Sequence, residues 1–259
     1  MATTITTYTK LSEYTQMFAN GNTELLVIQS SGGAGKTELV NKIMINTNKP
    51  YLLINCHLTP LELYKLAFIY RDMPIVLDDI ESLLQSKQNI ALIKQLAETS
   101  KDGIKRVGWH STTERLEDIP HSFETKSRIL VLANELPFVN KKLGQAVLTR
   151  GFNVRFEPSN EELINKIKEF CNDSEIIEFL VQHCRYANNF NLRSAVKAVQ
   201  LKKEFPSCWK EELLKDMELN EEFMKVALLI QNYSSDAERI ANYDKSERTF
   251  YRYKAKLTT

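Results

Sequence analysis

A loop of small residues that ends in Gly-Lys-Thr carries the clearest chemistry in this sequence. It lies between the apolar run Leu25–Gln29 and an amphipathic stretch that begins at Lys36. Backbone N–H groups of such a loop converge on phosphate oxygens, the following helix directs its positive end toward them, and the lysine adds a positive charge. The pattern predicts a nucleoside triphosphate site. Its residues are Gly32, Gly33, Ala34, Gly35, Lys36, Thr37 and Glu38.

Ser30 departs from the usual form of this loop, which begins with a glycine. Ser31, Gly32 and Gly33 keep the loop small, so we expect the serine to be tolerated. A plain glycine turn between strand and helix is the alternative interpretation. Strand, loop, Lys-Thr and helix occur in the required order, which favours the phosphate site.

Two consecutive carboxylates, Asp78 and Asp79, end the apolar run that begins at Ile75. Ligands of doubly wound sheets bind at the carboxyl ends of the strands, so this run delivers both acids to the phosphates. We predict that Thr37 and Asp78 bind Mg²⁺ and that Asp79 is the general base for the attacking water. A turn in which the aspartates only cap the following helix is the alternative.

Two further polar residues stand at the ends of predicted elements. Asn134 directly follows the apolar run Ile129–Ala133, where its side chain would orient the attacking water. Arg150 ends the helical stretch before the run Phe152–Phe156. By itself, Arg150 is also consistent with a cation that balances the helix dipole.

Apolar strands alternate with helical stretches in the first part of the chain. The alternation predicts an α/β fold with a parallel five-stranded sheet and helices on both faces. The strand candidates are Glu24–Gln29, Tyr51–Asn55, Ile75–Asp78, Arg128–Ala133 and Phe152–Phe156. The helix candidates are Lys36–Met44, Pro60–Phe68, Ile80–Thr99 and Lys141–Arg150, the last of them closed by Gly151 as a helix-stopping glycine.

The strand pattern ends at Pro158, and helices follow. The first three are predicted at Asn160–Phe170, Ser174–Arg185 and Asn191–Lys203, and they form a helical lid subdomain. We therefore expect three domains: an α/β nucleotide-binding domain at 1–158, the lid at 159–205, and a small all-α C-terminal domain at 206–259 that begins with a linker helix.

The order of these features resembles the AAA+ ATPase family over about residues 11–204. Asn191–Val196 is similar to the family's sensor-2 segment. The resemblance implies ATP and Mg²⁺ as ligands, contact of Arg193 with the terminal phosphates, and a sensor-1 role for Asn134. It also implies that Arg150 acts on the site of a neighbouring subunit, so that the active form is a homo-oligomeric ring or spiral. Most members have Asp-Glu where this chain has Asp78-Asp79, and Asp-Asp is typical of bacterial replication initiators, helicase loaders and transposition ATPases.

The segment from Lys101 to Lys126 does not fit this pattern. It contains five residues suited to nucleic acid: Lys101, Lys105, Arg106, Trp109 and His110. An insertion of this kind could line a pore and contact DNA. A surface loop with Trp109 packed on the sheet is the alternative.

The C-terminal segment predicts a helix-turn-helix module. Residues 235–241 and 246–257 are helical patterns, and 242–245 is the turn. Phe250, Tyr253 and Leu257 recur at helical spacing and would form the core with Ile240, Val226, Leu229 and Ile230. The other face would contact DNA through Lys245, Arg248, Thr249, Tyr251, Arg252 and Lys254. A solvated basic helix is the alternative.

Composition is that of an ordinary globular chain of 259 residues, with a net charge of +1. Near neutrality excludes wholesale electrostatic attachment to nucleic acid, so DNA would be bound by a local patch. The first ten residues lack a charged-then-apolar leader, and no apolar run approaches membrane-spanning length. We expect a cytoplasmic protein without membrane contact, and the scattered cysteines indicate free thiols.

The sequence therefore predicts a DNA-binding ATP hydrolase that oligomerises with ATP on DNA. Its expected role is replication initiation or helicase loading for a mobile or viral element, with a replication or transposition protein as partner. Three alternatives remain open: an AAA+ ring DNA helicase, a transposition target-selection ATPase and an ATP-gated transcription regulator.

Overall fold

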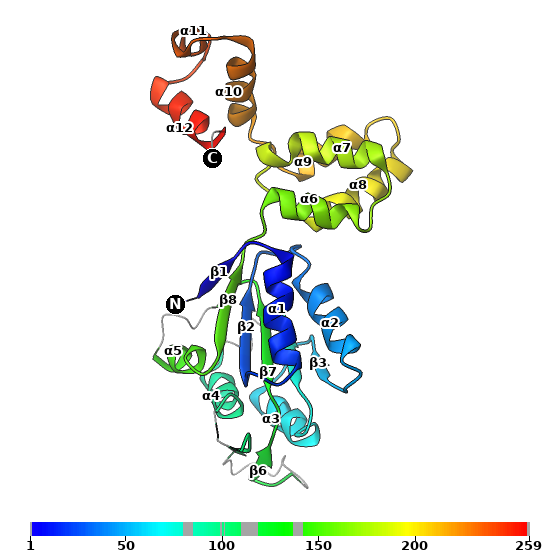
Figure 1. The fold of residues 1–259 in the computed structure, drawn as a ribbon, viewed down its shortest axis with the longest axis vertical. Coiled ribbons are helices and arrows are strands. Elements are labelled where there is room, and N and C mark those ends of the chain that lie inside the picture. Colours follow the sequence, from blue (N-terminus) through cyan, green and yellow to red (C-terminus); the bar gives the residue numbers. More distant parts are fainter. Residues whose placement is uncertain are drawn as a thin grey trace. The chain divides into compact units, whose positions relative to one another are not determined.

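The computed structural model describes residues 2–79, 85–98, 100, 102–109, 119–136 and 142–257. The chain divides into two compact units, Met1–Glu162 and Leu163–Thr259 (Figure 1). The boundaries of the three expected domains stay a prediction. No helix within the described ranges is long and apolar enough to cross a membrane.

The first unit is built on a six-stranded sheet whose paired strands are all parallel. The strands lie in the order β1-β8-β2-β7-β4-β3. Their bounds are β1 Thr3–Ile5, β2 Leu25–Gln29, β3 Leu52–Ile54, β4 Ile75–Asp78, β7 Ile129–Ala133 and β8 Phe152–Phe156. The two strands beside β7 are β2 and β4, so the phosphate loop, Asp78 and Asn134 end at one edge of the sheet.

Helices pack on both faces of the sheet (Figure 1), and alternate residues of the strands belong to opposite core clusters. In β2, Leu25 and Val27 belong to one core cluster, and Leu26 and Ile28 belong to the other. The first cluster lies under α3 Pro60–Ile69, α4 Lys87–Leu96 and α5 Lys142–Leu148, and the second under α1 Tyr8–Ala19 and α2 Lys36–Asn46. The strands are apolar on both faces because both are covered, which confirms the predicted α/β class.

The expected number of five strands is wrong, because β1 adds a sixth parallel strand beside β8. In β1 only Ile5 is buried, and the two threonines before it are exposed. Such a short and mostly polar edge strand has no apolar run by which it could be recognised. The other five strands were predicted to within one residue at each end.

A separate two-stranded antiparallel hairpin, β5 Lys105–Gly108 and β6 Ser122–Thr125, occupies the segment that did not fit the pattern. Helix α4 is shorter than the predicted Ile80–Thr99, because the Ser86 side chain caps its start and accepts from the N–H of Asn89. Residues 80–84 and 99 lie outside the described part of the chain.

Gly151 does not have the conformation of a helix-stopping glycine. Helix α5 ends at Leu148, and the described glycines with positive φ are Gly21, Gly33, Gly35 and Gly103. A Cβ on Gly151 would lie 2.1 Å from the carbonyl oxygen of Leu25. The glycine is therefore needed because the chain entering β8 passes directly against β2.

The second unit is helical. Helix α6 Asn160–Lys168 leads into it from the first unit, as predicted. The remaining elements are α7 Ser174–His183, the 3₁₀ turn η3 Cys184–Tyr186, α8 Leu192–Glu204, α9 Trp209–Asp216, α10 Glu221–Asn232, α11 Asp236–Ala241 and α12 Glu247–Leu257. Asn191 caps α8 through its side chain, so the predicted start of this helix is correct to one residue.

Candidate functional site

The loop between β2 and α2 has the backbone that phosphate binding requires. Gly33 and Gly35 have φ values of 80° and 74°, in the region that side-chain-bearing residues rarely adopt. Gly35 is also the N-cap of α2, so the first N–H groups of that helix follow the loop directly. Ser30 is not among the described residues with positive φ, which explains why a serine is accepted where glycine is usual.

Lys36 is held inside this loop, and its exposed fraction is 5%. Its Nζ donates to the backbone oxygen of Ser30 at 3.3 Å and to Oδ1 of Asn134 at 2.7 Å. Ser30 is itself bonded through its N–H to the carbonyl oxygen of Ala133, on β7. The lysine charge is therefore oriented by residues that follow β2 and β7, which are paired in the sheet.

Thr37 and Asp78, the two predicted magnesium ligands, are in contact. Their side chains share a hydrogen bond, in which the threonine hydroxyl donates to the carboxylate. Asp78 is 1% exposed, and its Oδ1 has no partner among the described residues. A buried carboxylate oxygen with no partner is costly unless a cation or donor meets it, so the pair fits an oxygen-ligated Mg²⁺.

Burial raises the pKa of the Asp78 carboxyl above its ordinary value. The nearby Asp79 charge raises it further, whereas the Thr37 hydrogen bond and the Lys36 charge lower it. Desolvation is the largest of these effects, because taking a carboxylate out of water disfavours its charged form. A divalent cation at this point would reverse that balance.

Asp79 follows with its side chain exposed at the edge of the sheet. Its φ of 50° lies in the left-handed region, which is uncommon for residues other than glycine and is tolerated best by Asn and Asp. The backbone turn separates the two neighbouring carboxylates, so that Asp78 is buried and Asp79 faces solvent. This arrangement allows one to hold a metal and the other to accept a proton.

Arg150 is engaged by its own chain. Its Nε and Nη2 donate to Oε2 of Glu98 at 3.2 and 3.1 Å, and its Nη1 donates to the carbonyl oxygen of Ala146. The side chain is 21% exposed. The structure thus places Arg150 with Glu98, and its predicted action on a neighbouring subunit stays a prediction.

Arg193 lies in the second unit, in the first turn of α8, with its side chain exposed. Glu38 lies in the first turn of α2, where an acid matches the helix dipole, and it is exposed. Their predicted contacts with nucleotide remain predictions.

Sequence reasoning missed Tyr8, which touches the phosphate loop. Its hydroxyl donates to the carbonyl oxygen of Ala34 at 3.0 Å, and its backbone N–H donates to Oε2 of Glu162 at 3.0 Å. The ring packs edge-on against Phe156 with centroids 5.1 Å apart. Only its position at the start of a helix could have marked it, since no motif contains it.

Two of the residues suited to nucleic acid pack into the fold: Lys105 is buried in the hairpin, and Trp109 beside it is partly buried. Lys105 is 2% exposed, and its Nζ donates to Glu24 and to the backbone oxygen of Ser127. Burial lowers the pKa of Lys105, although Glu24 opposes that effect. Trp109 packs on the main core with its ring 6.1 Å from that of Tyr64, so the packed alternative is correct for it.

Arg106, by contrast, is exposed, and its Nη2 donates to the hydroxyl of Ser122 at 3.3 Å. Lys101 and His110 lie outside the described residues.

The C-terminal helices have the predicted core. Val226, Tyr243 and Phe250 are buried together, and the partly buried residues around them are Leu229, Ile230, Ile240, Tyr253 and Leu257. Tyr243 donates to Oε2 of Glu222 at 3.0 Å. Burial, together with Glu222, raises the pKa of Tyr243 to about 12, so this bond persists at neutral pH.

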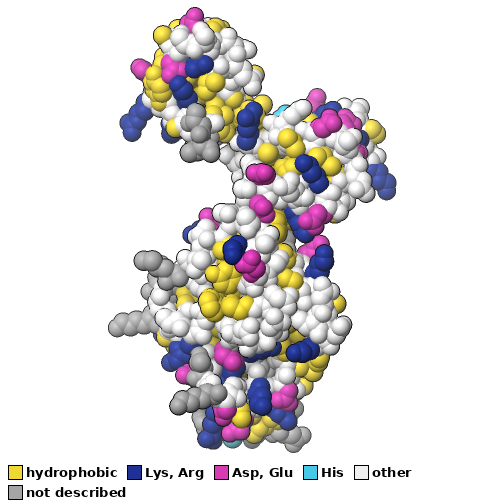
Figure 2. Space-filling view, viewed as in Figure 1, with side chains coloured by type: hydrophobic (Ala, Val, Ile, Leu, Met, Phe, Trp, Pro, Cys, Tyr) yellow, Lys and Arg dark blue, Asp and Glu magenta, His cyan; other side chains and the backbone are white. Residues whose placement is uncertain are grey.

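Of the six predicted DNA-binding residues, two form ion pairs, three others are exposed and one is half-buried. Lys245 pairs with Oε1 of Glu222 at 3.1 Å, and Lys254 pairs with Asp236. Arg248, Tyr251 and Arg252 are exposed. Thr249 is half-buried, and its hydroxyl shares a 2.8 Å hydrogen bond with that of Ser246. Figure 2 shows basic and acidic side chains next to each other on this part of the surface.

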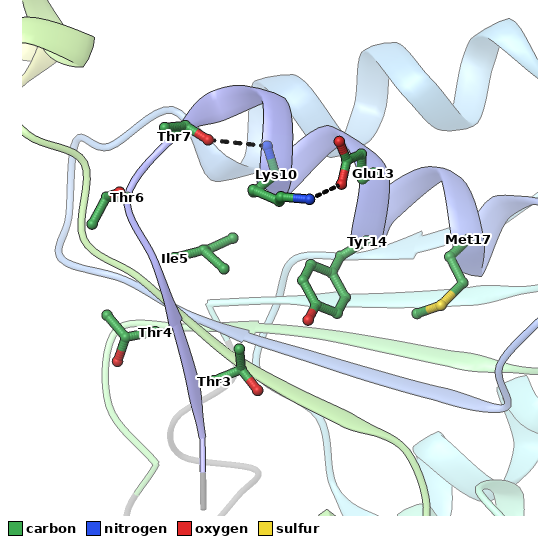
Figure 3. A pocket seen from close by; sticks show the side chains of 9 residues that line it. All are labelled: Thr3, Thr4, Ile5, Thr6, Thr7, Lys10, Glu13, Tyr14 and Met17. Carbon is green, nitrogen blue, oxygen red and sulfur yellow. Dashed lines mark hydrogen bonds and ion pairs between the residues drawn. The ribbon is translucent and has the colours of Figure 1, made fainter.

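In the first unit, a pocket of about 510 Å³ lies between β1 and α1 (Figure 3). Its lining is Thr3, Thr4, Ile5, Thr6, Thr7, Lys10, Glu13, Tyr14 and Met17. The charged residues of the lining, Lys10 and Glu13, pair with each other at 2.6 Å. Neither the phosphate loop nor the acid pair contributes to it.

No protein-family profile matches the chain, and no curated protein matches it. Among solved structures, the chain is similar to two variants of RuvB from Thermotoga maritima, with TM-scores of 0.53 and 0.51 and 11% identity. Both matches cover 96% of this chain, and they cover 86% and 85% of the RuvB chains. A match to AMPPCP-bound DnaA from Aquifex aeolicus has a TM-score of 0.49 and 18% identity, over 96% of this chain and 76% of that one.

The parallel sheet, the phosphate loop between β2 and α2 and the similarity to the RuvB structures define the class of the fold. It is the AAA+ form of the P-loop α/β fold, with a six-stranded parallel sheet followed by helices. At this level of identity the likeness concerns the fold.

Proposed function

We propose that this chain is a DNA-binding AAA+ ATPase that assembles with ATP on DNA. The observation that carries the proposal is the convergence of Lys36, Asn134, Thr37 and Asp78 at the carboxyl edge of the sheet, beside the glycine loop. A structural glycine turn would need neither a buried lysine nor a buried carboxylate with an unpartnered oxygen. Each is explained if a triphosphate and its cation bind between them.

Hydrolysis in this proposal uses residues at the same edge. The backbone N–H groups of the loop and the Lys36 ammonium bind the phosphates. Thr37 and Asp78 would hold Mg²⁺, which when bound would supply positive charge against the phosphate oxygens. Asp79 accepts a proton from water as the water oxygen attacks the terminal phosphorus and the bond to the ADP oxygen breaks. Asn134 orients that water.

Two arginines complete the site in the assembled form. Arg150 of one subunit leaves Glu98 and reaches the terminal phosphate held by its neighbour, where its charge stabilises the transition state. Arg193, which lies on the lid helix α8, contacts the terminal phosphate. Because the site is incomplete in a single chain, hydrolysis depends on assembly into a homo-oligomer, as a ring or a spiral.

DNA is bound by the C-terminal helices. The exposed residues Arg248, Tyr251 and Arg252 lie on one helix whose other side is fixed in a core by Phe250. This is the arrangement that a helix-turn-helix module needs in order to place a helix in the major groove, with side chains toward bases and phosphates.

The biological role we propose is replication initiation or helicase loading for a mobile or viral element. The Asp78-Asp79 pair and the DNA-binding module at the C-terminus favour it, and target selection in transposition uses the same parts. A ring helicase with the hairpin as its motor loop is less well supported, because Lys105 is buried in an ion pair with Glu24 and Trp109 is partly buried against the core. An ATP-gated transcription regulator, in which ATP turnover is incidental, is the other alternative.

One experiment separates these roles. Purified protein is mixed with ATP and forked DNA, and ATP turnover and strand separation are followed together. The proposal predicts DNA-stimulated turnover with little unwinding, whereas rapid unwinding by this protein alone would support the helicase. If Asp79→Asn abolishes turnover and every biological output is retained, the regulator is correct and the proposed ATP-driven role is wrong.

A further inference from the structure

The second unit contains a joint between the lid helices and the C-terminal helices. We define the joint as residues 186–189 and 217–220 together with Phe223. Backbone bonds link the two segments: the N–H of Asn220 donates to the oxygen of Tyr186 at 2.8 Å, and that of Asn188 donates to the oxygen of Glu218 at 3.1 Å. Ala187 and Leu219 form an antiparallel bridge between them.

Aromatic side chains continue this joint into the C-terminal helices. Tyr186 and Phe223 are each 9% exposed, and their rings meet edge to face with centroids 5.5 Å apart. Phe223 in turn stacks on Tyr253 of α12 at 5.9 Å. A cluster of Tyr186, Phe223 and Ala227, with Leu257 packed against it, therefore connects η3 to α12.

The same segment reaches the start of α8. The N–H of Asn189 donates to the oxygen of Met217 at 3.1 Å, and Oδ1 of Asn189 accepts from Nδ2 of Asn191 at 3.0 Å. Asn191 is the cap of α8, and its Oδ1 accepts from the N–H of Arg193 at 2.9 Å. Residues 186–193 therefore connect the aromatic cluster that packs against α12 to Arg193, the arginine proposed to contact phosphate.

We propose that Tyr186 and Phe223 are positioning residues that fix the DNA-binding helix to the lid, so that ATP binding and DNA binding are coupled through the joint. The inference rests on the function proposed above. A flexible linker would allow α12 to reorient independently of Arg193, whereas a buried aromatic contact makes the two elements change position together. Coupling of this kind is reciprocal, since each ligand must change the affinity for the other by the same factor.

The test measures DNA affinity of the full chain with and without a non-hydrolysable ATP analogue, and analogue affinity with and without duplex DNA. In the wild type we expect both ratios to be equal and about tenfold, within the usual range for coupled sites. Tyr186→Ala and Phe223→Ala should reduce both ratios to below about twofold, with each affinity measured alone changed by less than about threefold.

Control variants separate positioning from folding. Tyr186→Phe and Phe223→Leu keep a buried apolar side chain at the joint and should retain most of the coupling. Phe205→Ala, at an exposed aromatic residue of the same unit, should behave as the wild type. Circular dichroism and thermal melting identify any variant that fails to fold. If one of the two alanine variants fails to fold, the other alanine variant gives the result.

A second measurement needs no ligand. Amide ¹⁵N relaxation of the wild type should give α12 and α8 the same rotational correlation time, and Phe223→Leu should retain it. Independent tumbling of α12 would overturn the inference. So would unchanged coupling in folded Tyr186→Ala, or a wild-type ratio of one. A wild type that binds neither ATP nor DNA would instead contradict the proposed function, even with α12 held to the lid.

Discussion

The Nζ of Lys36 lies 2.7 Å from Oδ1 of Asn134, a residue 98 positions further along the chain. Parallel pairing of β2 with β7 brings them together, since both residues follow the carboxyl ends of these strands. The lysine charge and the amide dipole are therefore aligned by the fold, which reduces reorganisation during reaction.

Asn134→Ala should lower ATP turnover by about 10- to 100-fold and change ATP affinity by less than about threefold, because water orientation matters in the transition state more than in the bound state. Steady-state kinetics and equilibrium binding measure the two effects separately. Gln29→Ala is the matched control, since it removes a polar side chain near the same point, 3.5 Å from the Asn134 backbone oxygen. Equal losses of ATP turnover in both variants would show that Asn134 has no specific role in orienting the water.

Asp78→Asn should stabilise the ligand-free protein and abolish stabilisation by Mg²⁺ with ATP. At neutral pH the substitution removes a buried charge with an unpartnered oxygen, which we expect to add about 1–2 kcal/mol to the free energy of unfolding. Urea denaturation with and without Mg²⁺ and ATP gives both quantities. A destabilised variant would show that the carboxylate is satisfied without a cation.

The pH dependence of this gain follows from the raised pKa of Asp78. The folded state holds the proton more tightly than the unfolded chain, so ionisation costs stability as the pH rises from 3.8, the ordinary value, through the raised one. The advantage of Asp78→Asn should be absent below the ordinary value and complete above the raised one. The same urea series at several pH values tests this sign.

Arg150 should act on the site of a neighbouring subunit. Asp79→Asn and Arg150→Ala should each reduce ATP turnover at least about 100-fold, in line with the effect of supplying such an arginine. An equimolar mixture should recover a substantial fraction of activity, because an intact Asp79 site then meets an intact Arg150. Analytical ultracentrifugation confirms that the variants assemble together. No recovery in mixed oligomers would place Arg150 with Glu98 as a structural pair.

Arg252→Ala should reduce the slope of log affinity for DNA against log salt by about one, since each phosphate contact releases about one counterion. Arg248→Ala should do the same. Lys254→Ala is the instructive comparison, because Lys254 is paired with Asp236 and we expect it to change the slope less. Fluorescence anisotropy over a salt series measures all three. Unchanged slopes for both arginines would exclude α12 from the DNA contact.

The placement of the residues of the proposed phosphate site was predictable because they belong to local motifs joined by regular topology. Lys36 and Thr37 follow one strand and Asp78 follows another, and parallel pairing brings strand ends together without any knowledge of side-chain contacts. The core of the C-terminal helices was predictable for a similar reason, because Phe250 and Tyr253 recur at helical spacing.

The other residues could not be predicted because their surroundings depend on long-range contacts. Lys105 is of a residue type that is usually exposed, and its burial is tolerated because the distant Glu24 and the backbone oxygen of Ser127 accept from its Nζ. Gly151 stands where a helix ends, but the constraint on it is the backbone of Leu25. Tyr8 belongs to no motif and meets the phosphate loop through the fold alone. Such residues cannot be assigned from spacing, because their partners are set by tertiary packing.

Equilibrium titration with a fluorescent ATP analogue and Mg²⁺ tests the central claim most directly, comparing the wild type with Lys36→Ala. We expect micromolar binding by the wild type and a loss of at least about 100-fold in the variant, because the variant lacks the charge that binds the phosphates. Wild-type affinity in a folded Lys36→Ala protein, or no binding by the wild type, would contradict it.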